Sequence, residues 1–261
     1  MDAYHTMAAS TNSRRNFVKR TALAAVAATG LSNMQLLAAS DTAMPVKESN
    51  LTILFQGDSI TDGNRGRDKD PNHIMGHGYA FSIASRVGAA FPAKNNLFYN
   101  RGISGNKITD LALRWQTDTL ELQPDVLSIL VGINDTNAVV NQQDIVSPQQ
   151  YETVLRSLLQ QTLAKFPDCL LVLCEPFILP VGRVKENWNA WHDDILQRQA
   201  IVKTVAKEFN AVFVPLQQTF TDACNKAAPD YWIWDGVHPT VAGHELMARK
   251  WINEVQKRIS F

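Results

Sequence analysis

The chain has 261 residues, of which 45% are hydrophobic and 19% are charged, and this composition suits a globular protein with one sizeable core. The formal net charge is zero, but residues 1–39 hold four basic residues and one acidic residue, which leaves 21 basic against 24 acidic residues in the remainder. This balance gives no electrostatic case for binding nucleic acid or anionic membrane surfaces.

The first 45 residues resemble a twin-arginine export signal followed by a linker. Residues 13–19 read Ser-Arg-Arg-Asn-Phe-Val-Lys, and a mildly apolar, alanine-rich stretch follows at residues 21–39. A basic amphipathic helix is the alternative. A retained membrane anchor is disfavoured, because polar residues interrupt a segment that is already short for a bilayer. We therefore expect a periplasmic or secreted protein, without stable membrane insertion after export, whose folded domain spans residues 46–261.

Apolar runs alternate with helical patterns along the rest of the chain. The runs are residues 51–56, 97–100, 126–131, 170–174 and 211–215. Each interval has room for a helix, and helices are expected over residues 147–166, 187–210 and 241–259 from their apolar stripes. This alternation predicts a parallel sheet with helices on both faces.

The first apolar run ends in the turn Gly57-Asp58-Ser59. A serine there lies just beyond the carboxyl end of a buried strand, where open α/β sheets expose their reactive groups. By itself, such a serine is more typical of a helix N-cap than of a nucleophile. Polar loops expected at residues 62–78 and 175–191 would lie at the same edge of the sheet.

Three further motifs supply the groups that a nucleophilic serine needs. Residues 100–106 contain Gly105, residues 132–135 contain Asn134, and Asp235 precedes His238 by three residues. That last spacing lets the carboxylate hold Nδ1–H of the imidazole and leaves Nε2 free as a base. Each motif alone has an ordinary explanation as a turn or a cap. Together they provide a nucleophile, a base, an orienting acid and hydrogen-bond donors.

These motifs resemble the four sequence blocks of the SGNH hydrolases, also called the GDSL esterase/lipase family, over residues 51–245. The resemblance implies a flavodoxin-like, three-layer α/β/α sandwich with a five-stranded parallel sheet. It implies that Ser59 is the nucleophile, His238 the base and Asp235 its partner. The oxyanion hole would be Ser59 N–H, Gly105 N–H and the Asn134 side-chain amide. This chemistry needs neither a metal nor an organic cofactor.

The resemblance implies that the substrate is a small-molecule or glycan ester, because the family includes carbohydrate acetylesterases, lysophospholipases, thioesterases and lipases. The polar loops favour removal of acetyl groups from a carbohydrate, with a lysophospholipase or thioesterase as the alternative. Four tryptophans are candidates for stacking on sugar rings, although the first two also suit packing of their helix: Trp188, Trp191, Trp232 and Trp234. The oligomeric state stays open.

Two other classes of function remain open. One is a glycan-binding protein without activity on the same scaffold. The other is a metal hydrolase with the ligands Asp58, Asp62, Asp135 and His238. The remaining histidines in the domain have no partner at an informative spacing and are expected to be structural or solvent-facing: His73, His77, His192 and His244.

The three cysteines do not suggest a disulfide framework. Cys169 and Cys174 lie five residues apart in one expected strand, so their side chains point to opposite faces and cannot bridge. Cys224 lies alone in a later helix. We expect buried free thiols.

Overall fold

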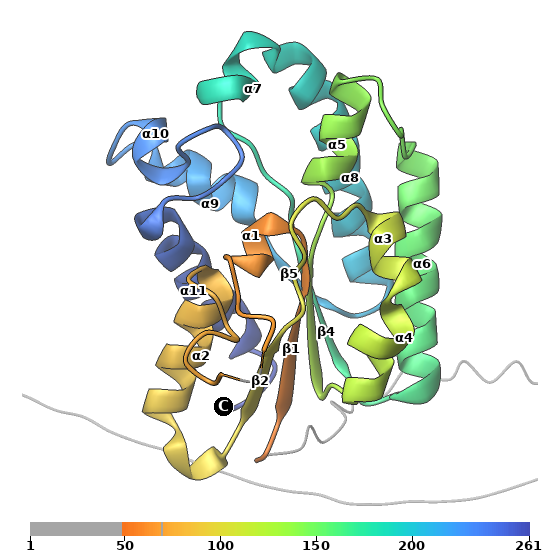
Figure 1. Cartoon of the computed structure of the whole chain (residues 1–261), viewed down its shortest axis with the longest axis vertical. Coiled ribbons are helices and arrows are strands. Elements are labelled where there is room, and N and C mark those ends of the chain that lie inside the picture. The colour runs from red at the N-terminus through yellow and green to blue at the C-terminus, as the bar shows by residue number, and fades with distance from the viewer. Residues whose placement is uncertain (1–48, 69) are drawn as a thin grey trace, which may run out of the picture. The chain divides into compact units, whose positions relative to one another are not determined.

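The computed structural model describes residues 49–68 and 70–261, so the expected export signal at residues 1–45 lies outside the described residues. The five strands are β1 (Thr52–Gly57), β2 (Leu97–Asn100), β3 (Val126–Leu130), β4 (Leu170–Cys174) and β5 (Val212–Val214). All neighbouring strands pair in parallel, in the order β2-β1-β3-β4-β5 (Figure 1). This is the flavodoxin-like order, and it confirms the predicted sheet.

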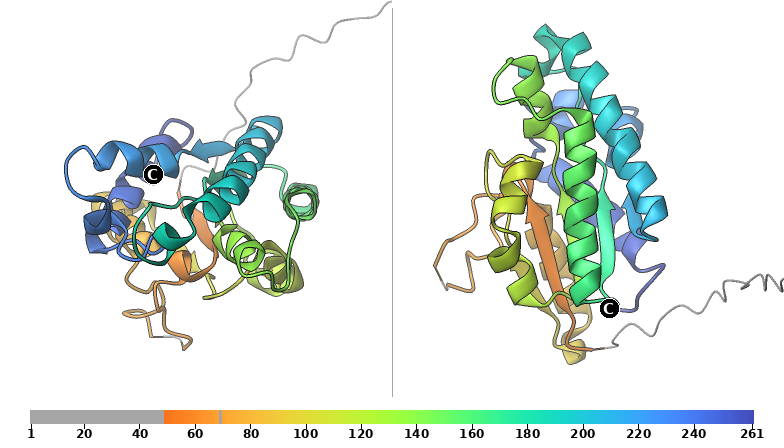
Figure 2. Two further views of the ribbon diagram at one scale, coloured as in Figure 1. Left: turned by 90° about the horizontal axis from the view of Figure 1, so that it is seen from above. Right: turned by 90° about the vertical axis from the view of Figure 1, so that its right-hand side faces the viewer.

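Helices cover both faces of this sheet. They are α1 (Ser59–Asp62), α2 (Tyr79–Ala90), α3 (Ile108–Leu113), α4 (Trp115–Asp118), α5 (Ile133–Val140), α6 (Pro148–Lys165), α7 (Gly182–Glu186), α8 (Trp188–Glu208), α9 (Leu216–Ala223), α10 (Pro229–Trp232) and α11 (Val241–Val255). Helices α2, α9 and α11 lie on one face, and α3, α6 and α8 lie on the other (Figures 1 and 2). The expected three-layer sandwich is therefore present. Among the described residues, no helix has both the length and the apolar character to cross a membrane.

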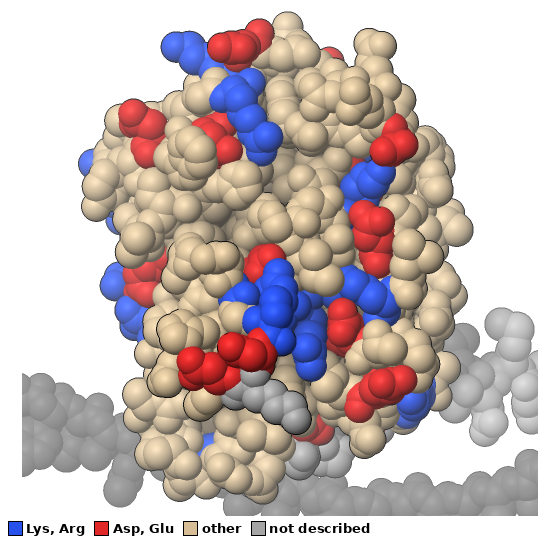
Figure 3. Space-filling view, in the orientation of Figure 1, with Lys and Arg blue, Asp and Glu red and all other residues tan. Residues whose placement is uncertain are grey.

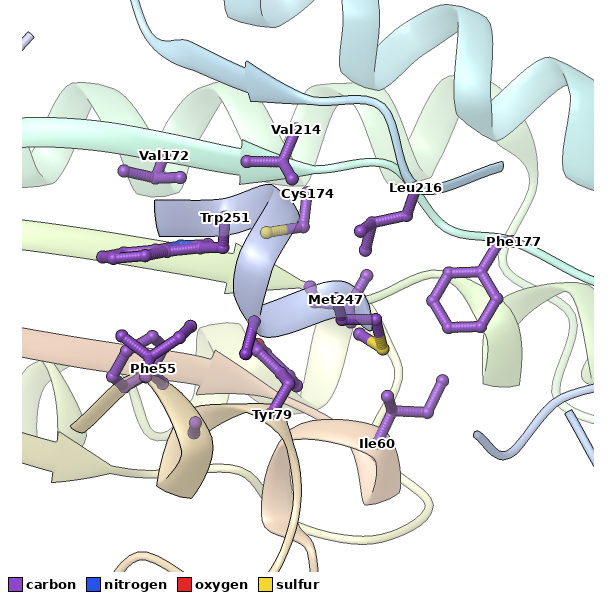
Figure 4. Close-up of a cluster of buried hydrophobic side chains, with 14 of the residues drawn as sticks. Phe55, Ile60, Tyr79, Val172, Cys174, Phe177, Val214, Leu216, Met247 and Trp251 are labelled. Carbon is purple, nitrogen blue, oxygen red and sulfur yellow. The ribbon is translucent and has the colours of Figure 1, made fainter. Parts of the chain in front are cut away.

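Side chains alternate along each strand, so the sheet separates two apolar clusters. On one face, Phe55 of β1 packs against Trp251 of α11 and Tyr79 of α2, with ring centroids 5.5 and 5.9 Å apart (Figure 4). On the other face, Leu54 joins Trp115 in the cluster beneath α3 and α6. This packing fixes α2 and α11 next to each other, which matters for the site below.

The cysteines follow the same alternation. Cys169 and Cys174 are buried in different clusters, on opposite faces of the sheet, and all three cysteines are free. Burial raises the pKa of Cys169 and of Cys174 to about 12. Cys224 lies at the end of α9 and is half-buried. The expectation of free thiols is confirmed, with Cys224 less buried than the other two.

One expected loop is partly helical. Residues 175–191 contain α7 and the first turn of α8, so they do not form one continuous loop. Trp191 is 3% exposed and belongs to the core. This tryptophan therefore packs its helix against the sheet.

Candidate active site

The turn after β1 positions Ser59 at the carboxyl edge of the sheet. A Cβ atom on Gly57 would lie 2.3 Å from the carbonyl oxygen of Leu130, so only glycine lets β1 approach β3 this closely. Asp58 then caps α1, because its Oδ1 accepts the backbone N–H of Ile60 at 3.0 Å. Ser59 is the first residue of α1.

Ser59, His238 and Asp235 form one hydrogen-bonded series. Ser59 Oγ lies 2.9 Å from His238 Nε2, and His238 Nδ1 lies 2.8 Å from Asp235 Oδ2. The serine and histidine are 179 residues apart in the chain. The structure therefore brings together the three residues that the sequence singled out.

Local hydrogen bonds hold Asp235 as a carboxylate. Its Oδ1 accepts the backbone N–H groups of Val237 at 3.0 Å and His238 at 2.7 Å. Burial alone would raise the pKa of Asp235, but the hydrogen bonds from His238 and Val237 together lower it to about 2. Arg183 Nε adds a positive charge 3.5 Å from Asp235 Oδ2. The carboxylate stays ionised across the physiological range and can stabilise a protonated imidazole.

A hydrogen bond to Asn106, the residue after Gly105, holds the Asn134 side chain close to Gly105. We refer to residues 101–106 as the Gly105 loop. Asn134 Nδ2, at the start of α5, donates to the carbonyl oxygen of Asn106 at 3.1 Å. Its second amide hydrogen has no acceptor among the described residues and is available to a ligand. Gly105 has a φ of 87°, and a Cβ there would have nothing within 4 Å, so its surroundings are open.

Two polar side chains hold the Gly105 loop: Asn100, and Asp62, which the sequence suggested only as a ligand of the metal alternative. Asn100 Nδ2 donates to the carbonyl oxygens of Thr61 and Met75 at 2.7 and 3.0 Å, and its Oδ1 accepts Gly102 N–H at 2.9 Å. Asp62 Oδ2 accepts the backbone N–H of Ser104 at 3.0 Å. The only sequence signal for Asn100 was its position as the last residue of an expected strand.

Arginines support the same loop from outside. Arg65 Nε donates to the carbonyl oxygen of Gly102 at 2.9 Å, and Arg67 pairs with both carboxylate oxygens of Asp62. Burial and repulsion from the like charges of Arg67 and Arg101 lower the pKa of Arg65 to about 10. Basic side chains gather in the middle of this face of the molecule, with acidic groups beside them (Figure 3). Arg65 and Arg67 thus help to fix the backbone around Gly105.

A cleft of about 350 Å³ opens next to Ser59. Its lining includes Ser104, His238 and Trp234, which was one of the candidates for stacking on sugar rings. It also includes two residues that the sequence did not indicate for the site, His77 and His244. Trp234 is 63% exposed, and its ring is nearly parallel to that of His238 at 6.3 Å. As expected, His77 is solvent-facing and His244 is structural, and both also form part of the cleft wall. The expectation that His73 has no partner was wrong, because its Nδ1 lies 2.6 Å from Asp70 Oδ2.

The carboxylates of the metal alternative serve other partners. Asp58 caps α1, Asp62 pairs with Arg67, and Asp135 accepts the backbone N–H of Ile108 at 3.2 Å. Burial raises the pKa of Asp58 to about 7 and that of Asp135 to about 6. In residues 49–68 and 70–261, no three His, Cys, Asp or Glu side chains are grouped as metal ligands.

Solved structures with the same fold include that of a protein described as a GDSL-like lipase from Parabacteroides merdae. It is 39% identical, with a TM-score of 0.77, over 80% of this chain and 97% of that chain. An acetylxylan esterase of Geobacillus stearothermophilus is 34% identical over 212 residues, which are 78% of this chain and 93% of the esterase. Its crystal structure gives a TM-score of 0.72 at 32% identity, over 81% and 96% of the two chains. Three variants of that esterase, with alanine in place of a serine, an aspartate or a histidine, are described as catalytic mutants.

A five-stranded parallel sheet with this hydrogen-bonded series at its carboxyl edge, together with these relatives, defines a carboxylic ester hydrolase. The model of the GDSL-like lipase/acylhydrolase family matches residues 55–246. The chain belongs to that family.

Proposed function

We propose that the protein removes acetyl groups from a carbohydrate, with Ser59 as nucleophile, His238 as base and Asp235 as its orienting acid. The observation that carries the proposal is the 2.9 Å separation between Ser59 Oγ and His238 Nε2, with Asp235 on the other ring nitrogen. This is the arrangement that a serine hydrolase uses to transfer a proton during attack.

In the first half-reaction, Ser59 Oγ attacks the ester carbonyl carbon while its proton moves to His238 Nε2. The tetrahedral intermediate then collapses, the bond to the sugar oxygen breaks, and His238 gives the proton to the leaving alcohol. In the second half-reaction, a water molecule attacks the acetyl-enzyme by the same route and releases acetate. Asp235 stays ionised and stabilises the imidazolium ion throughout.

The negative oxygen of each intermediate needs hydrogen-bond donors. We assign these donors to the backbone N–H groups of Ser59 and Gly105 and to the Asn134 amide. The free amide hydrogen of Asn134 and the open surroundings of Gly105 support this assignment. Such donors lower the barrier because they are fixed before charge develops.

A glycan acetate suits the cleft better than a long acyl chain. The cleft beside Ser59 has polar walls and an exposed tryptophan, Trp234, whose face suits the apolar face of a sugar ring. An apolar hollow of about 410 Å³ between α8 and α9 does not include Ser59 in its lining, so it gives no groove for a lipid tail at the reacting serine. The similarity to an acetylxylan esterase supports the same substrate class.

Acetate release from acetylated xylooligosaccharides, compared with hydrolysis of long-chain nitrophenyl esters, tests this function. The wild-type enzyme should prefer the oligosaccharides, and Ser59→Ala should lose nearly all turnover while keeping its melting temperature. Fluorophosphonate labelling of wild type but not of Ser59→Ala would eliminate the binding-protein alternative. A preference for lysophosphatidylcholine or long-chain esters would favour the lysophospholipase alternative instead.

We also propose that residues 1–45 direct export and that residues 46–261 form the hydrolase domain. Support comes from the paired arginines Arg14 and Arg15 before an alanine-rich stretch. Replacing both with lysine should leave the enzyme in the cytoplasm of a host with a twin-arginine pathway, whereas the wild type should reach the periplasm or medium. Equal export of the two proteins would contradict the proposal.

A further inference from the structure

One ring nitrogen of His244 accepts a hydrogen bond from the protein backbone. It lies on α11, and its Nδ1 is 3.1 Å from the backbone nitrogen of Tyr79, which donates to it. Tyr79 is the first residue of α2, and the N-cap before it, Gly78, has no side chain to supply this acceptor. Because Nδ1 accepts a hydrogen bond, the neutral ring must carry its proton on Nε2.

The ring is neutral at physiological pH. Burial, together with the neighbouring imidazoles of His77 and His238, lowers the pKa of His244 to about 4. Nε2 has no hydrogen-bond acceptor among the described residues. It is also absent from the unpartnered side-chain atoms that are buried, so solvent can reach it. His244 lines the cleft together with Ser59 and His238. The cleft wall therefore holds a neutral N–H donor that the catalytic mechanism does not use.

The leaving alcohol is the part of the substrate that meets this wall. His238 Nε2 must return its proton to the leaving oxygen, so that oxygen lies against His238. The cleft lining includes His238, Trp234 and His244 but neither Gly105 nor Asn134, which we assign to the carbonyl oxygen. A sugar in this position offers hydroxyl and ring oxygens as acceptors close to the ester.

We propose that His244 Nε2–H donates a hydrogen bond to an oxygen of the sugar that carries the acetyl group, and so determines specificity for carbohydrate esters. This inference rests on the proposed deacetylase function. The competing explanation is that His244 serves only as the cap of α2. The two explanations differ in which ring nitrogen matters.

Two substitutions separate the nitrogens. His244→Asn keeps an acceptor near the position of Nδ1 and leaves nothing at Nε2, whereas His244→Gln places an amide near Nε2. His192→Asn is the matched control, because His192 stacks on Trp188 and lines a different hollow. For each variant, kcat and KM are measured on an acetylated xylooligosaccharide and on nitrophenyl acetate, together with the melting temperature.

His244→Asn should raise KM for the oligosaccharide, and the ratio of kcat/KM for the oligosaccharide to that for nitrophenyl acetate should fall about tenfold, the effect of one lost hydrogen bond. His244→Gln should recover part of this ratio, and His192→Asn should keep it. A ratio unchanged in His244→Asn, or equal losses on both esters that follow melting temperature, would overturn the inference and leave the deacetylase intact. If the wild type releases no acetate from the oligosaccharide, the proposed function fails, and this inference fails with it.

Discussion

The carboxylate of Asp62 holds the backbone of Ser104, with Oδ2 accepting the N–H group at 3.0 Å. Asp62 ends the short helix that begins at Ser59, and Ser104 precedes Gly105. One side chain thus connects the helix that begins at Ser59 to the Gly105 loop. Burial opposes ionisation of this carboxyl, but hydrogen bonds from Arg67, Ser104 and Arg65 lower its pKa.

Asp62→Asn should weaken catalysis through this connection. The carboxylate of Asp62 accepts hydrogen bonds through both of its oxygens, from Arg67 and from Ser104. An asparagine side chain has only one acceptor oxygen, so one of these contacts should be lost and the Gly105 loop should loosen. We expect kcat to fall about tenfold and unfolding to cost about 1 to 3 kcal/mol less. Asp68→Asn, at an exposed position of the loop that follows Asp62, is the control. Equal kcat values for the two variants would show that the connection has no catalytic role.

Asn134→Ala should remove one of the three donors that we propose for the oxyanion hole. The expected loss in kcat is about 10² to 10³, with little change in KM, because the donor acts mainly on the charge that develops in the transition state. Steady-state kinetics on nitrophenyl acetate would measure it. Asn137→Ala, one turn further along α5 and half-buried, controls for the helix itself. A variant with the wild-type kcat would exclude Asn134 from the site.

Asp58 should make stability depend on pH. Its pKa rises from 3.8 to about 7 in the folded protein, so between these values the folded state holds a proton that the unfolded state has lost. The free energy of unfolding therefore falls as pH rises through this window. Asp58→Asn keeps an acceptor for Ile60 N–H and does not titrate. We therefore expect the melting temperature of Asp58→Asn minus that of the wild type to increase from pH 4 to pH 7. If this difference stays constant, the pKa of Asp58 is not raised as stated.

Gly102→Ala should be far more damaging than Gly88→Ala. A Cβ on Gly102 would lie 2.3 Å from the backbone nitrogen of Asp62, and backbone has little room to shift. The nearest atom to a Cβ on Gly88, in the last turn of α2, is 4.0 Å away, so alanine there should stabilise the helix by about 0.5 to 1 kcal/mol. Activity and thermal unfolding of both variants test this pair. An active, stable Gly102→Ala would show that the close approach is not required.

The sheet was predictable because its central strands β1, β3 and β4 are apolar runs buried on both faces, and the partly exposed edge strand β2 still begins with three apolar residues. The predicted run 211–215 became Val212–Val214, and the others agree as closely. The grouping of Ser59, Asp235 and His238 was predictable for a related reason. The topology places the turn after β1 and the segment before α11 at one edge, and Asp235 and His238 are only three residues apart.

Other parts of the site carry no local pattern. The contact between His244 and Tyr79 joins residues 165 apart, and it exists because α11 packs against α2. Ser104 and Asp62 are 42 residues apart, and neither their spacing nor their neighbours indicate a contact. Helix α7 has only five residues, too few for a periodic apolar stripe, so it was predicted as loop.

The placement of the cysteines sets the protein's response to oxidants. A thiol reacts as thiolate and must be reachable, and Cys169 and Cys174 meet neither condition, since both are buried and titrate at about 12. Cys224 is only half-buried, although burial also raises its pKa. The fold thus needs neither a reducing nor an oxidising compartment, and Cys224 is the thiol that alkylating or peroxide reagents would modify first.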